Sequence, residues 1–144
     1  MKKILKSLVI CMVAVMLLAA LASCGAEKVS ENAVTVNVKI SAGGTVIFDD
    51  EVFVNSDEPT VMKAFQQAMD DDNEFPEVVF DYDDEGNPVS VLTIGEFADS
   101  AEKYWEFRVN DIAFADIKGR ANGYAINDGD QIFWEYGVVE EAAE

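Results

Sequence analysis

The stretch Val34-Thr35-Val36-Asn37-Val38-Lys39-Ile40 alternates apolar and polar residues at every position. Successive side chains of a β-strand point to opposite faces, so this alternation predicts a strand with one buried and one solvated face. Ala42-Gly43-Gly44 supplies a turn, and Thr45 to Val54 is predicted to be a second extended segment. Together the two segments predict a β-hairpin at the start of the domain.

A single helix is predicted directly after this hairpin. Its apolar residues fall on one face at helical spacing, namely Val61, Ala64, Phe65, Ala68 and Met69. Ser56-Asp57-Glu58-Pro59 offers capping residues and a proline that the first helical turn tolerates. Asp70-Asp71-Asp72-Asn73 is predicted to end the helix, and we expect fraying there because acidic residues oppose the helix dipole.

The rest of the chain predicts four more strands and a short tail. The strands are Val78 to Tyr82, Val89 to Ile94, Tyr104 to Asn110 and Gln131 to Tyr136. One helix among about six strands predicts an α+β domain over residues 33–137. In this fold the helix packs on one face of a mostly antiparallel sheet, and residues 138–144 form an acidic tail.

The N-terminus predicts a lipoprotein. Lysines at positions 2, 3 and 6 precede an apolar run, Leu8 to Leu21, which is shorter than the about 20 residues that span a membrane. Leu21-Ala22-Ser23-Cys24 resembles a bacterial lipobox, which predicts a signal peptide over residues 1–23 and diacylglycerol on Cys24. Residues 24–32 are then a polar tether, and two acyl chains suffice to hold the protein on the extracytoplasmic side of the cell membrane. The alternative is an uncleaved anchor helix with an incidental cysteine.

Composition excludes several classes of function. Residues 1–23 hold three lysines and no acid, so the mature chain sets seven Lys or Arg against 28 Asp or Glu, a net charge of −21. Such a surface repels nucleic acid and anionic lipid. The chain has no histidine, Cys11 leaves with the signal peptide and Cys24 carries lipid, so no usual general base or thiolate nucleophile is left. We therefore expect neither an enzyme nor a resident cofactor.

One acidic loop partly fits a calcium-binding motif. Asp81-Tyr82-Asp83-Asp84-Glu85-Gly86 matches the start of an EF-hand loop, but the bidentate glutamate required at position twelve is Leu92. Pro88 and the strand pattern around it favour a solvated hairpin loop, and no metal site is predicted. A low-affinity calcium contact at this loop or at Asp70–Asp72 is the alternative.

Aromatic residues occupy both faces of the last two predicted strands: Tyr104, Trp105, Phe107, Phe133, Trp134 and Tyr136. A sheet covered by a helix on one side needs only one apolar face. The second face therefore indicates another covering layer or a ligand platform, with at least half of these residues expected in the core.

Two segments resemble a known family. Tyr104-Trp105-Glu106-Phe107 and Tyr124-Ala125-Ile126-Asn127-Asp128-Gly129-Asp130-Gln131-Ile132 resemble the C-terminal β-domain of the transcobalamin and intrinsic factor family, and equally the related bacterial domain DUF4430. Pro59-Thr60-Val61-Met62-Lys63-Ala64-Phe65 resembles the first helix of that family. The similarity extends over about Val34 to Tyr136.

The resemblance implies a β-grasp-like domain, which in the vitamin carriers covers one face of cobalamin. It implies Trp105 as the first ligand-contacting residue, with Tyr104 beside it and Val89, Val91 and Thr93 on the preceding strand.

The chain departs from the family pattern at three points. It lacks the large helical domain that closes the other face of the ligand in the carriers, Val89 replaces an aromatic found in some of them, and Asn110-Asp111 replaces a bacterial Asn-Gly turn. Two functions follow as hypotheses: a module that binds a corrinoid (cobalamin-like) ligand, or a protein- or glycan-interaction module of the cell envelope that uses its acidic surface or a sheet edge.

Overall fold

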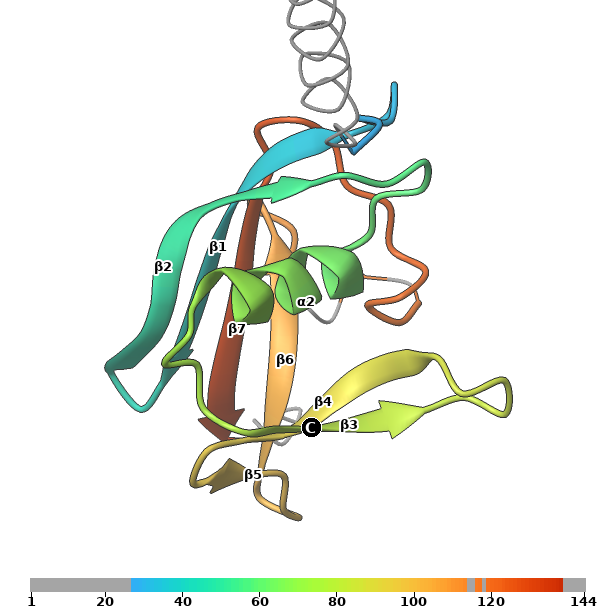
Figure 1. Cartoon of the computed structure of the whole chain (residues 1–144). Coiled ribbons are helices and arrows are strands. Elements are labelled where there is room, and N and C mark those ends of the chain that lie inside the picture. The colour runs from blue at the N-terminus through green and yellow to red at the C-terminus, as the bar shows by residue number, and fades with distance from the viewer. Residues whose placement is uncertain (1–26, 114–115, 118, 139–144) are drawn as a thin grey trace, which may run out of the picture.

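The predicted hairpin opens the domain in the computed structural model, which describes residues 27–113, 116–117 and 119–138 (Figure 1). Strands β1 (Val34–Ala42) and β2 (Thr45–Val54) pair antiparallel, with Val36 opposite Val52. The buried residues of β1 alternate with more exposed ones, as the sequence pattern requires. The hairpin is therefore confirmed with its predicted bounds extended by two residues in β1.

The main sheet has four strands in the order β2-β1-β7-β6. β6 (Lys103–Val109) and β7 (Gln131–Val138) pair antiparallel, whereas β1 and β7, far apart in sequence, pair in parallel. Helix α2 (Val61–Asp71) crosses one face of this sheet (Figure 1). The predicted α+β fold with one helix over a mostly antiparallel sheet is thus confirmed.

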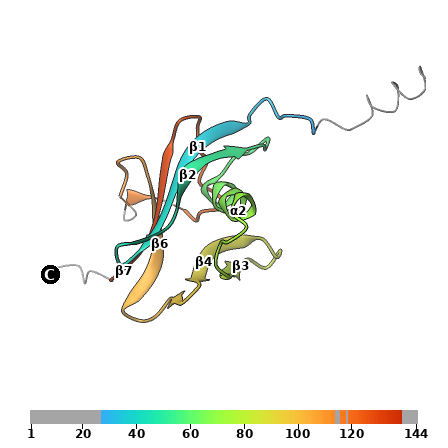
Figure 2. The same ribbon diagram turned by 60° about the vertical axis from the view of Figure 1, so that its left-hand side comes forward.

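A second sheet of three strands was not predicted. It has the order β3-β4-β5 and consists of β3 (Val78–Tyr82), β4 (Pro88–Ile94) and β5 (Phe97–Ala98). β3 and β4 were expected, but in a single sheet with the others. β5 has two residues, too few to show any periodicity in the sequence. In Figure 2 the β3–β4 hairpin projects from the body below α2.

The helix begins later than the sequence predicts. Thr60, rather than Ser56 or Asp57, is the N-cap, and its hydroxyl oxygen accepts the Lys63 backbone N–H at 3.3 Å. Pro59 lies outside the helix, so its predicted place in the first turn is wrong. The physical reason is that Ser56 is used elsewhere, since its hydroxyl accepts the Lys63 ammonium at 2.8 Å.

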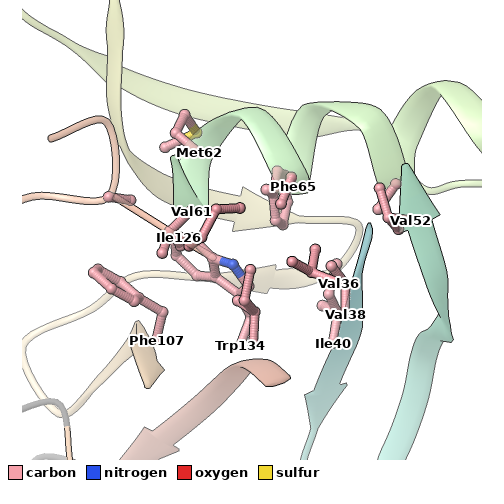
Figure 3. Packing of buried hydrophobic residues seen from close by; sticks show 14 of the residues in the cluster. Val36, Val38, Ile40, Val52, Val61, Met62, Phe65, Phe107, Ile126 and Trp134 are labelled. Carbon is pink, nitrogen blue, oxygen red and sulfur yellow. The ribbon is translucent and has the colours of Figure 1, made fainter. Parts of the chain in front are cut away.

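The hydrophobic core lies between α2 and the main sheet (Figure 3). Val61, Ala64, Phe65 and Ala68 of the predicted helix face are buried, and Met69 is half-buried. Phe65 contacts Trp134 of β7, with ring centroids 5.1 Å apart. The buried valines and isoleucine of β1 complete the layer below the helix (Figure 3).

The described part of the predicted tether is attached to the domain. Ser30 donates its backbone N–H to Asn55 at 2.8 Å, and the Asn32 amide donates to the Asp57 carbonyl at 2.8 Å. The residues predicted to form the signal peptide, the predicted lipidation site Cys24 and residues 139–144 lie outside the described residues. Val138, predicted to begin the tail, belongs to β7. Within the described residues, no helix has the length and apolar character needed to cross a membrane.

Candidate functional site

The residues implicated by the resemblance do not share one open face. Trp105 and Val89 are each 3% exposed and Val91 is fully buried. Tyr104 and Thr93 are half-buried. Because Tyr104 and Trp105 are adjacent on β6, their side chains lie on opposite faces of the main sheet. A role for these five residues in ligand binding stays a prediction.

Trp105 joins the two sheets. Its indole N–H donates to the Phe97 carbonyl at 2.9 Å, and its backbone N–H donates to the Asp99 carboxylate at 2.8 Å. Its ring lies 5.4 Å from that of Tyr136, whose hydroxyl donates to the Ala98 carbonyl at 2.5 Å. We call these five residues the Trp105 clasp, because they attach β5 to strands β6 and β7.

The carboxylate of the clasp is electrostatically perturbed. Partial burial raises the pKa of Asp99, because desolvation disfavours its charged form, and the hydrogen bond from the Trp105 backbone N–H acts in the opposite direction.

Next to the clasp is a groove of about 500 Å³, which we call the β4–β5 groove. Three segments meet there: the start of β2, the loop after α2 and the turn between β4 and β5. Its apolar walls are Val46, Ile47, Pro76, Ile94 and Phe97, and its carboxylates are Asp72, Glu74 and Glu96. None of the described residues that line it is basic.

Backbone geometry shapes this groove. Gly95 turns the chain with φ +58°, and a Cβ at this position would approach the Pro76 Cβ to 3.3 Å. The Gly95 N–H also donates to the Glu77 carbonyl at 2.8 Å, which ties the β4–β5 turn to the segment before β3. Contacts with other clasp residues fix the position of Phe97 in the groove wall. Its ring lies 5.7 Å from that of Tyr136, and its carbonyl accepts a hydrogen bond from the Trp105 indole N–H.

The groove can bind a ligand that combines apolar surface with N–H groups. A ligand that covers the apolar walls removes them from water, which contributes favourably to the free energy of binding. The carboxylates of the groove accept hydrogen bonds from amide or ammonium groups. The β1–β2 turn and β5, which lie on either side of the groove, are at the end of the domain opposite residues 27–33 (Figures 1 and 2).

Sequence patterns do not reveal this groove, because its residues come from three segments with no common periodicity. The available local signal is Ile94-Gly95-Glu96-Phe97, in which a glycine interrupts a strand pattern and marks a close backbone approach. The sequence does not show that β3, β4 and β5 form a second sheet, so this glycine alone does not predict which segment lies against it.

The acidic segment with partial calcium-loop character is a hairpin loop between β3 and β4. The Asp83 carboxylate accepts backbone N–H groups of Asn87 at 2.8 Å and Glu85 at 3.0 Å. These bonds, that from Asn87 first, hold the pKa of Asp83 below its usual value. Among the described residues, no three or more His, Cys, Asp or Glu side chains are grouped to hold a metal ion.

Comparison with known proteins identifies a structural relative. No family model and no curated protein matches the chain. The crystal structure of haptocorrin in complex with Cbi is similar to it, with a TM-score of 0.61 and 14% sequence identity. Haptocorrin belongs to the transcobalamin family, so the predicted resemblance is confirmed for the fold, while the DUF4430 resemblance has no matching family model.

The likeness is partial in extent. It covers 81% of this chain but 27% of the haptocorrin chain, so this chain corresponds to about a quarter of that protein. At this level of identity the likeness shows a shared fold, and the neighbour is a binding protein rather than an enzyme.

Proposed function

We propose that this protein is a lipoprotein anchored on the extracytoplasmic side of the cell membrane, and that its domain binds a small ligand in the β4–β5 groove. A corrinoid is the first candidate. The observation that carries the proposal is the groove itself, which sets carboxylates around apolar walls in a fold shared with haptocorrin.

The chemistry of a corrinoid suits this groove. A corrin is a flat, largely apolar macrocycle whose edge carries amide groups. One edge of the ring would contact Val46, Pro76 and Phe97, which all keep exposed surface, while its amide N–H groups would donate to the neighbouring carboxylates. Trp105 would then act through Phe97, as a positioning residue behind the wall of the groove.

We expect the affinity to be modest. A groove of about 500 Å³ is within the usual range for ligand sites, about 300–1,000 Å³, but a corrinoid would fill it with only part of its surface. The unburied part contributes no binding energy, while the loss of translational and rotational freedom is the same as for an enclosed ligand.

Titration of the detergent-solubilised mature protein with cobalamin and with cobinamide tests this proposal. Val46 is 53% exposed in the groove, so Val46→Ser should weaken binding about tenfold, the cost of losing part of an aliphatic contact. Phe53→Ser on β2 is the matched control, because Phe53 is 48% exposed but lies outside the groove, and it should leave calorimetric affinity unchanged.

Two results would contradict the proposal. If millimolar cobalamin and cobinamide produce no heat, the corrinoid is wrong. If either binds and Val46→Ser has no more effect than Phe53→Ser, the ligand lies outside the β4–β5 groove.

The lipid anchor is tested separately. Cys24→Ser removes the thiol that would carry diacylglycerol, so the variant should lack the lipid mass and move from the detergent phase to the aqueous phase on partitioning. Ala22→Gly, a change to another small residue before the cysteine, is the control and should leave both unchanged. Identical mass and partitioning of Cys24→Ser and the natural protein would exclude lipidation at Cys24.

A further inference from the structure

Charge is distributed unevenly along the chain. From Ala64 to Glu102 the sequence contains no Lys or Arg, and it contains twelve acids: Asp70, Asp71, Asp72, Glu74, Glu77, Asp81, Asp83, Asp84, Glu85, Glu96, Asp99 and Glu102. This segment includes most of α2 and the whole three-stranded sheet. The main sheet, by contrast, pairs cations with acids, as in Lys39–Asp49 at 3.4 Å and Arg108–Glu135 at 3.8 Å.

The outer edge of β3 is open. β3 is the first strand in the order β3-β4-β5, and among the described residues no strand pairs with its other side. Its backbone groups on that side form a row of donors and acceptors that a further strand can complete. Beside this edge Val79 is 47% exposed and Tyr82 is 56% exposed, so apolar surface accompanies the free backbone groups.

We infer that the β3 edge binds an extended, Lys- or Arg-rich segment of a partner polypeptide by strand addition. Main-chain hydrogen bonds to β3 would provide binding, while side chains on one face of the added strand would contact Val79 and those on its other face would contact Tyr82. Basic side chains of the partner would lie close to Asp81 and the acidic loop that follows it. None of the β3 residues lines the β4–β5 groove, so this surface is distinct from the proposed ligand site.

Charge complementarity selects this partner. A second copy of the chain would bring the same uncompensated acids against each other, which opposes self-association through β3. A basic segment, by contrast, would meet opposite charges and no like charge there, because residues 64–102 contain no Lys or Arg.

The other edges fit such a partner less well. On β2, one of the exposed acids, Asp49, is already paired with Lys39 at 3.4 Å, so this edge offers less uncompensated charge to a basic strand than β3 and the loop after it. β6 carries Lys103 and Arg108, which repel a basic strand. The two-residue β5 is too short to provide a pairing surface.

The β3 edge favours a short partner. Pairing of β3 with β4 contains two irregularities, between Val79 and Phe80 and between Asp81 and Tyr82. Such bulges increase the local twist and shorten the regular edge. We therefore expect modest affinity that falls when ionic strength screens the charges.

The test uses three fluorescent, capped peptides with the mature protein in detergent. The first is Lys-Val-Lys-Val-Lys-Thr-Lys, the second replaces both valines with proline, and the third replaces every lysine with glutamate. Anisotropy should show binding of the first peptide, binding at least about tenfold weaker for the proline peptide, which lacks two N–H donors, and no binding of the acidic peptide. Hydrogen exchange should show new protection of residues 78–82.

Exposed variants locate the site. Val79→Lys and Tyr82→Lys place cations beside the edge without disturbing buried residues, and each should weaken binding of the first peptide about tenfold. Phe53→Lys adds the same charge at an equally exposed position on β2 and should have little effect. Equal binding of the proline peptide, equal loss with Phe53→Lys, or unchanged exchange at 78–82 would each overturn strand addition at β3. An absence of binding by the first peptide would do the same.

Discussion

Phe65→Ala is expected to lower the free energy of unfolding by about 3–5 kcal/mol, the usual cost of truncating a buried phenylalanine. Phe65 is fully buried and its ring lies 5.1 Å from Trp134 of the main sheet and 5.8 Å from Phe80 of the second sheet. It also contacts Phe75 in the loop after α2, with ring centroids 5.9 Å apart. The variant therefore leaves a cavity between the helix and the two sheets; Figure 3 shows the side of this contact that faces Trp134.

Urea unfolding followed by circular dichroism measures this effect. Gln66→Ala is the control, because Gln66 is an exposed neighbour on the same helix and its replacement should change stability by less than about 0.5 kcal/mol. If Phe65→Ala costs less than about 1 kcal/mol, the helix does not pack on the sheet as described. A loss of about 4 kcal/mol is a large fraction of the stability of a domain this size, so a reduced yield of folded protein is also expected.

The helix and the longer strands were predictable from sequence because their burial is periodic. The alternation in β1 and the spacing of Val61, Ala64, Phe65 and Ala68 both identify the residues that face the core. The helix start was not predictable in the same way. Ser56, Asp57 and Thr60 can each cap a helix. The choice of Thr60 depends on tertiary contacts, such as the bond from the Val61 N–H to the Tyr124 carbonyl at 3.1 Å.

The division into two sheets could not be predicted from the sequence for a different reason. β3 and β4 show strand patterns, but a strand pattern does not state which sheet the strand joins. That assignment depends on β5, which is placed by tertiary contacts: its two carbonyls accept hydrogen bonds from Trp105 and Tyr136, and the Phe97 ring lies 5.7 Å from that of Tyr136. The β4–β5 groove could not be predicted until this junction was known.

The role of Trp105 shows how a motif can identify an important residue without identifying its task. The resemblance implies that its indole lies against a ligand, and the aromatic pattern on β6 allowed either a platform or a core residue. In the structure Trp105 is 3% exposed, and both of its N–H groups donate to the segment Phe97–Asp99. The side chain therefore holds a sheet junction, and a ligand in the groove would be affected by it through Phe97.

Trp105→Ala is accordingly expected to lower the free energy of unfolding by about 3–5 kcal/mol, as for other buried tryptophans. Trp105→Phe separates packing from hydrogen bonding, because it keeps an aromatic ring but leaves the Phe97 carbonyl without the indole donor, at a cost of about 1–3 kcal/mol. Hydrogen exchange in Trp105→Phe should increase first in residues 97–99, since these are attached to the main sheet by the clasp. Lys103→Ala, an exposed change on the same strand, should alter neither property.

Thermal unfolding of these variants, measured alongside corrinoid titration, decides between the two roles of Trp105. If the clasp is correct, Trp105→Ala loses stability in the absence of any ligand, and Trp105→Phe weakens binding only to the extent that the Phe97 wall of the groove is loosened. If Trp105→Ala leaves the melting temperature unchanged but abolishes binding, the indole contacts the ligand directly and the clasp is wrong. The burial of Trp105 and its two hydrogen bonds favour the first result, because a side chain with so little exposed surface cannot present a plane to a macrocycle unless β5 first separates from the main sheet.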